Sequence, residues 1–177
     1  APSIAQRKFH LLLVDAKGSA RKVAEGLVFP HGMVLTNEGR TLLVCETFAS
    51  RITAFDRAHD GSLCNRRVWA ELSHGSYQTI AEGVASGAPL PDGMAIDAEG
   101  IVWIGDAAGR GPLRVAEGGG ILERIDTGDL AAFAVALGGS SGRDLFICAS
   151  PPLLSNDPAT DHRASLLVCS LAAPAAK

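Results

Sequence analysis

The sequence predicts an all-β protein built from repeated antiparallel units, either a β-propeller or part of one. Short apolar runs of strand length alternate with polar, glycine-containing turns along the chain, and the 20 glycines and 9 prolines supply many turn positions. No segment shows a convincing helical period. A chain of 177 residues, 47% of them hydrophobic, is sufficient for one domain with a buried core.

The first part of the chain has the pattern of six strands joined by turns. Apolar and β-branched residues gather in short runs that polar segments separate. The clearest pair of runs brackets residues 36–40, where Asn37 and Gly39 favour a hairpin turn. The six strands are expected over residues 9–14, 21–27, 33–35, 41–45, 51–55 and 65–69.

The same order of runs and turns then recurs, once clearly and once more faintly. The clear copy predicts strands over residues 93–96, 101–104, 113–115 and 121–125, and the fainter one over residues 133–137, 144–148 and 165–169. Gly93 and Phe133, at corresponding positions, are 40 residues apart. A four-stranded propeller blade takes roughly 40–45 residues, so this spacing supports a propeller. Residues 72–90 lengthen the preceding interval and are predicted to form a loop without strands.

These repeats divide the chain into three segments. Residues 9–170 are expected to form a partial β-propeller of the six-bladed type with about three and a half blades, which is fewer than the roughly four to eight that close a ring. Residues 1–8 are expected to be an N-terminal extension or a cut end, since the chain lacks an initiator methionine. Residues 171–177 are expected to be a frayed tail.

Charge and hydropathy exclude several classes of partner. The formal net charge of −3 and the pI near 5.9 provide no attraction to nucleic acid or to an anionic membrane surface. No apolar run approaches the roughly 18 residues of a membrane span, and the N-terminal residues do not have the pattern of a signal peptide. We therefore expect neither nucleic acid nor membrane as a partner.

The cysteines favour a reducing compartment. The chain has four, none of them in a CxxC pair, and Cys45, Cys148 and Cys169 lie in apolar runs. Because cysteine packs like a small hydrophobic residue, these three are predicted to be buried free thiols in strands. We expect a cytoplasmic protein on this basis.

One short motif occurs twice and carries the candidate chemistry. Pro30-His31-Gly32-Met33 and Pro91-Asp92-Gly93-Met94 share the form Pro-x-Gly-Met, and each precedes a short apolar run. In both copies the residue between proline and glycine can bind a metal ion. We expect His31 and Asp92 to face a common centre. The alternative is that each motif only forms a turn, which both Pro-Asp-Gly and Pro-His-Gly favour.

An ordered series of segments resembles the senescence marker protein-30 / gluconolactonase / luciferin-regenerating enzyme family. The matching segments are residues 29–33, 37–42, 51–56, 60–63, 65–69, 91–100 and 137–139. The resemblance implies a six-bladed propeller that hydrolyses lactones, and in some members phosphoesters, with one divalent ion in its central channel. Family members are longer, and the matches correspond to their C-terminal half.

The resemblance also implies roles for the two motif residues. Asp92 corresponds to a metal ligand that is a candidate general base, and His31 stands where the family usually has a metal-binding asparagine. The resemblance implies calcium, but imidazole suits zinc or iron(II) better than calcium. A metal-binding glutamate from the family's N-terminal part and its substrate-contacting arginine and asparagine have no counterpart in this chain.

The resemblance implies a metal-dependent hydrolase of the lactonase type, which opens a small, sugar-like lactone with metal-activated water. Two alternatives stay open: a non-catalytic propeller fragment that serves as a binding or assembly module, and a metal-free member similar to strictosidine synthase. The partial ring has three explanations. The chain is part of a longer protein, it is completed by a second chain, or it has lost the catalytic half.

Overall fold

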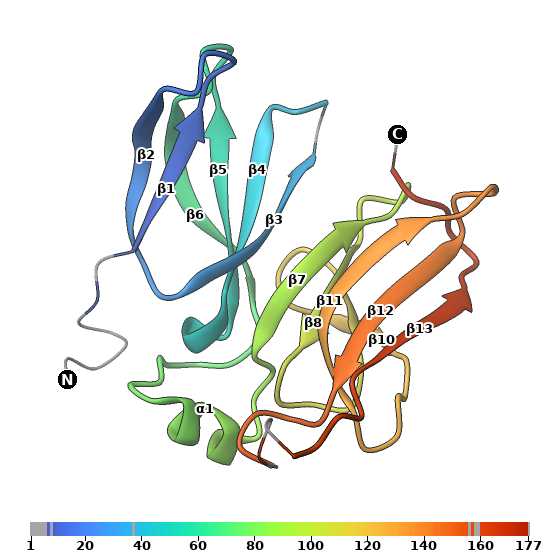
Figure 1. The fold of residues 1–177 in the computed structure, drawn as a ribbon. Helices are drawn as coiled ribbons and strands as arrows, with labels where there is room; N and C mark the ends of the chain where they lie inside the picture. Colours follow the sequence, from blue (N-terminus) through green and yellow to red (C-terminus); the bar gives the residue numbers. More distant parts are fainter. Residues whose placement is uncertain (1–6, 8, 37, 156, 158–159, 177) are drawn as a thin grey trace.

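The computed structural model describes residues 7, 9–36, 38–155, 157 and 160–176, and these form four antiparallel sheets (Figure 1). The all-β prediction is confirmed. Within each sheet the strands follow one another in sequence order. The first sheet contains β1 (Phe9–Val14) and β2 (Ala20–Leu27), and the second contains β3 (Pro30–Thr36), β4 (Thr41–Glu46), β5 (Arg51–Arg57) and β6 (Leu63–Glu71). The third contains β7 (Pro91–Ile96), β8 (Val102–Asp106), β9 (Leu113–Val115) and β10 (Ile121–Arg124), and the fourth β11 (Ala131–Gly138), β12 (Asp144–Ser150) and β13 (Ser165–Ser170).

The first strands of the last three sheets lie next to one another, because β7 contacts both β3 and β11. The glycines of the repeated motif permit this approach. A Cβ atom at Gly32 would lie 2.8 Å from the Met94 nitrogen, and one at Gly93 would lie 2.7 Å from the Ala134 Cα. Real Cβ atoms do not come this close to backbone, so both positions require the smallest residue.

We therefore expect Gly93→Ala to lower the free energy of unfolding by about 1–3 kcal/mol, since the added methyl group must displace the backbone of β11. Chemical denaturation of the variant and the parent chain measures this change. The matched control is Gly120→Ala, because a Cβ atom there meets nothing within 4 Å. Equal losses for the two variants would contradict the close approach.

The core lies between the sheets rather than within one of them. Leu43, Ile52 and Trp69 of the second sheet pack with Met94 and Ile104 of the third. A second cluster, centred on Trp103, Leu145 and Ile147, joins the third sheet to the fourth. Large apolar side chains remain exposed on several strands, including Leu12 and Val14 of β1, Met33 and Leu35 of β3, and Leu166 and Val168 of β13. Burial thus depends on whether a neighbouring sheet covers a given face.

The same rule explains where the cysteines lie. The structure has all four as free thiols, and Cys45 is buried in β4 as predicted. The prediction of burial is wrong for Cys148, which is exposed, and only partly right for Cys169. Cys148 is paired in register with Leu166, which is 70% exposed, so both lie on a sheet face that the described residues leave uncovered.

The segment between β6 and β7 forms no strand, as predicted, but contains the short helix α1 (Ile80–Ser86). Thr79 caps it by accepting a hydrogen bond from the Glu82 nitrogen, and Glu82 accepts one in return from the Gln78 nitrogen. Gly87 ends the helix with a positive φ of 68°. Seven residues are too few to show a helical period, which is why the sequence pattern did not indicate a helix. No helix among the described residues is long and apolar enough to cross a membrane.

The C-terminal segment is held in place instead of fraying as expected. The Ala175 nitrogen donates to the Gly142 carbonyl, and the Ala98 nitrogen donates to the Pro174 carbonyl. Residues 174–176 therefore connect the turn after β7 with the turn between β11 and β12. Of the expected N-terminal extension, residues 1–6 and 8 lie outside the described part of the chain.

Candidate functional site

The two motif residues occupy the same position in neighbouring strands. His31 is the second residue of β3 and Asp92 the second residue of β7. In both strands the pairing register shifts after the proline, between Pro30 and Met33 and between Pro91 and Met94. Such irregularities change the direction of the side chains they contain. The structure thus brings together the two residues that the sequence singled out.

His31 and Asp92 are in direct contact. His31 Nδ1 forms an ion pair with Asp92 Oδ1, and the exposed fractions of the two side chains are 50% and 11%. Apart from this contact, Asp92 Oδ1 is buried and makes no hydrogen bond. A buried carboxylate oxygen ordinarily has several donors, so this oxygen is available to a further positive group.

The contact changes the protonation of His31. Hydrogen bonding to Asp92 raises the pKa of His31, the negative charge of Asp92 raises it further, and partial burial of the imidazole opposes both effects. His31 therefore keeps its proton to a higher pH than an unperturbed histidine.

This shift predicts how stability depends on pH. A raised pKa in the folded state means that the pair stabilises the fold below the unfolded pKa of about 6.5, and that this contribution is lost as the pH rises through the folded value. The difference in melting temperature between the parent chain and His31→Asn should therefore be largest in mild acid and shrink at alkaline pH. In the Asp92→Asn background the difference should lose this pH dependence. A difference that stays constant with pH in the parent background would exclude the pairing.

Two sulfur atoms lie close to the pair. Cys45 Sγ is 3.7 Å from Met94 Sδ, and Cys45 is fully buried. Burial raises the pKa of the Cys45 thiol, and the negative charge of Asp92 raises it further. Cys45 is consequently a protonated packing residue and does not serve as a thiolate ligand or nucleophile.

The pair fits a metal ion in part. It offers one imidazole nitrogen and one buried carboxylate oxygen, both of which bind divalent cations. Within the described ranges, no three histidine, cysteine, aspartate or glutamate side chains come together as a metal site. His31 and Asp92 would thus hold such an ion only together with donors from elsewhere.

A cluster of apolar side chains, here called the apolar floor, lies at the end of the sheets where His31 and Asp92 are found. Phe29 stacks on His31 with ring centroids 6.4 Å apart and meets Phe48 edge-on at 5.0 Å. Phe48, in the 3₁₀ helix η2 (Thr47–Ala49), begins a cluster that extends towards β11. The residues of this apolar floor are Phe29, Phe48, Leu90, Ala107, Phe133 and Leu153. Helix α1 packs on it, because a Cβ atom at Gly83 would lie 3.2 Å from Leu90 and 3.3 Å from Phe48.

Two buried carboxylates fix the segments that lead to the site. In register, Glu46 lies opposite Pro30 and Asp106 opposite Pro91. Glu46 Oε2 accepts a hydrogen bond of 2.6 Å from the Val28 nitrogen, and Asp106 Oδ1 accepts one of 3.0 Å from the Leu90 nitrogen.

In both sheets an arginine of the outermost strand reaches the carboxylate. Arg66 of β6 pairs with Glu46 at 3.1 Å, and Arg124 of β10 pairs with Asp106 at 3.5 Å. The sequence pattern did not single out either carboxylate, because a glutamate or aspartate at a strand end is usually exposed.

A family model places the chain in a known family. Residues 4–150 match the family model described as the SMP-30/gluconolactonase/LRE-like region, so the chain belongs to this family. The prediction from the sequence is confirmed.

Solved structures agree with this assignment. A luciferin-regenerating enzyme is 17% identical, with a TM-score of 0.75 over 94% of this chain and 53% of its own. Regucalcin, a calcium-binding protein from Agrobacterium tumefaciens, is 17% identical, with a TM-score of 0.71, and the match covers 95% of this chain and 54% of regucalcin. A gluconolactonase from Xanthomonas campestris is 28% identical, with a TM-score of 0.60, and the match covers 80% of this chain and 42% of the gluconolactonase. The chain therefore spans about half the length of the structures it matches.

Proposed function

We propose that this chain forms part of a lactonase, in which the pair of His31 and Asp92 contributes to the hydrolysis of a small lactone. The observation that carries the proposal is the contact between these two residues on adjacent first strands, in a chain of the gluconolactonase family. The similarity to a gluconolactonase at 28% identity supports the same reaction class. Hydrolysis needs a group that takes a proton from water and a positive group beside the carbonyl oxygen.

The side chains of the pair match these needs. Asp92, held at the start of β7, would accept a proton from the attacking water as a general base. His31, protonated beside it, would orient the carboxylate and offer positive charge near the reacting carbonyl. As an alternative to this protonated state, we propose that neutral His31 and Asp92 would help to hold one divalent cation, which would polarise a bound carbonyl. Calcium is favoured by the similarity to regucalcin, and zinc or iron(II) by the imidazole ligand.

We also propose that the described sheets are about half of a six-bladed propeller and that other blades cover its ends. The exposed apolar side chains of β1 and β13 support this, because large apolar faces are rarely left open to water. The remaining blades would come from the other half of a longer chain or from a second chain. Sedimentation of the 18.3-kDa chain tests the second source, since a folded monomer at every concentration would exclude self-completion.

Hydrolysis of a panel of lactones, followed by release of acid, tests the proposed reaction. The assay is run after treatment with a chelator and again after addition of calcium, zinc or iron(II). Turnover that one cation restores would support the proposal. A chain in its assembled form that binds lactones but never opens them would instead be a binding module.

A further inference from the structure

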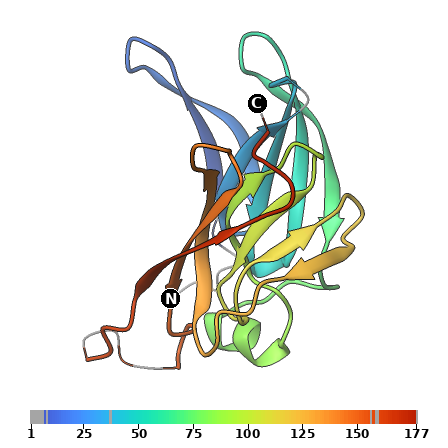
Figure 2. The same cartoon turned by 90° about the vertical axis from the view of Figure 1, so that its right-hand side faces the viewer.

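A cavity of about 480 Å³ lies beside β11 at the end of the molecule where the candidate site is found. It is formed by β11 and by the end of β12 with the residues that follow it. Its lining is largely apolar and includes Phe133, Pro151, Pro152, Leu153, Leu154 and Ala164. Figures 1 and 2 agree that this segment and helix α1 lie at the same end, where β7 begins. The volume falls in the range of small-molecule sites, roughly 300–1,000 Å³.

The cavity adjoins the strand that carries Asp92. Phe133, on its wall, occupies the position in β11 that corresponds to Gly93 in β7. A Cβ atom at Gly93 would lie 3.1 Å from the Phe133 carbonyl oxygen, so the two backbones touch one residue away from Asp92. Phe133 and Leu153 also belong to the apolar floor that begins beside His31. A ligand that extends from the pair towards β11 would meet this cavity.

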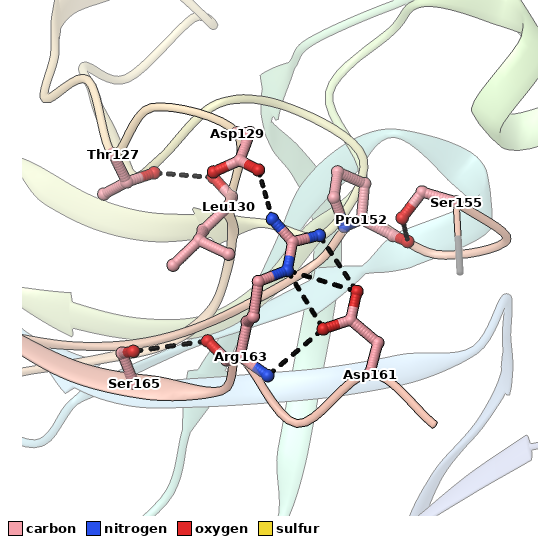
Figure 3. Close-up of polar contacts among 8 residues, drawn as sticks. All are labelled: Thr127, Asp129, Leu130, Pro152, Ser155, Asp161, Arg163 and Ser165. Atoms are coloured by element: carbon pink, nitrogen blue, oxygen red, sulfur yellow. Dashed lines mark hydrogen bonds and ion pairs between the residues drawn. The ribbon is translucent and has the colours of Figure 1, made fainter. Parts of the chain in front are cut away.

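The carboxylate in the lining already has a partner. Asp161 accepts hydrogen bonds from Arg163 Nε at 3.0 and 3.2 Å and pairs with Arg163 Nη2 at 2.9 Å. Figure 3 shows the Arg163 guanidinium between Asp161 and Asp129, with which it also forms an ion pair. The arginine thus neutralises Asp161 and connects the residues after β12 to the turn before β11. The charge of Asp161 therefore does not prevent apolar groups from entering.

We infer that this cavity binds a hydrocarbon substituent of the substrate, so that the enzyme acts on lactones with an alkyl side chain in preference to polyhydroxylated sugar lactones. This inference rests on the proposed function, because it places the lactone ring at the pair of His31 and Asp92. The walls supply mainly apolar contacts. The polar residues of the lining are Ser150, Asp161 and His162, so polyhydroxylated groups would replace only some of the hydrogen bonds to water that they lose there.

A homologous series of γ-lactones, from γ-butyrolactone to γ-decalactone, tests the inference. Binding is measured by calorimetry and turnover by acid release, with gluconolactone for comparison. Each methylene group that enters the cavity should tighten binding about fourfold, as expected for full burial of one such group. Chain-length-dependent binding without turnover would support the cavity and exclude the proposed reaction. If neither binding nor turnover depends on the length of the alkyl substituent, the inference is wrong.

Two matched variants locate the effect. Leu154 lines the cavity and is 64% exposed, whereas Leu122 of β10 is 56% exposed and lies outside it. Leu154→Asp should weaken binding of γ-decalactone at least tenfold, because a charged group would face the alkyl chain. Leu122→Asp should leave it unchanged. Ala164→Trp, an exposed position on the cavity wall, should reduce the gain per methylene by filling the space. Equal effects of Leu154→Asp and Leu122→Asp would exclude this cavity.

Discussion

Asp92→Asn is expected to reduce lactone turnover by about 10²- to 10⁴-fold, the usual contribution of a positioned acid or base. The substitution keeps the size of the side chain but removes its charge and its capacity to accept a proton. It also removes a negatively charged donor for a divalent cation. A pH-stat assay at saturating lactone gives the change in kcat, and a series of concentrations of the same lactone gives the change in KM.

A control variant must show whether turnover falls because Asp92 takes part in the reaction or because the protein is no longer folded. Asp60→Asn changes an exposed carboxylate in the turn between β5 and β6, where the amide can still accept the hydrogen bond from the Ser62 nitrogen. Turnover by this variant should equal that of the parent chain. Near-ultraviolet circular dichroism of both variants checks the packing of the aromatic residues. Parent-like turnover by Asp92→Asn would remove Asp92 from the mechanism.

The strands could be predicted from the sequence because the signals for them are local. Apolar runs and turn residues such as Gly39, whose φ is 78°, lie within a few residues of the structure they specify. The common position of His31 and Asp92 was also predictable, since a repeated motif at the start of equivalent strands brings its side chains together when the strands lie side by side.

Other features depend on residues that are far apart in the sequence. Glu46 can be buried because Arg66, 20 residues later in the sequence, pairs with it from β6. The residues next to Glu46 in the sequence do not indicate this partner. The segment at Pro174 is ordered by hydrogen bonds to residues 96–98 and to Gly142, although its composition is typical of a frayed end. The cavity at Phe133 arises from three segments, so no single motif indicates it.

The two carboxylates at the strand ends suggest why the motif residues are held so firmly. Glu46 and Asp106 stand at matching positions, and each fixes the backbone just before a Pro-x-Gly-Met motif. The position of the side chain after the proline therefore depends on a buried ion pair in its own sheet. Loss of this ion pair should affect the fold and the site together.

Glu46→Ala is accordingly expected to lower the free energy of unfolding by about 3–5 kcal/mol, as when one partner of a buried ion pair is removed. Glu46 is fully buried, and it accepts hydrogen bonds from Arg51, Thr53 and the Val28 nitrogen as well as from Arg66. The alanine leaves the buried Thr53 hydroxyl and the Val28 nitrogen without their acceptor, and it leaves two partly exposed arginines without their anion. Urea denaturation followed by tryptophan fluorescence measures the loss.

Two further variants distinguish the causes. Glu46→Gln keeps the shape and one acceptor oxygen but not the charge, so its loss should fall between those of the parent and the alanine variant. Glu38→Ala changes a glutamate whose side chain is 87% exposed and should alter stability by less than about 0.5 kcal/mol. If Glu46→Gln is as stable as the parent chain, the neutral hydrogen bonds suffice to hold the segment before His31. If it is as unstable as Glu46→Ala, the charge of Glu46 holds the two arginines, and through them the start of β3.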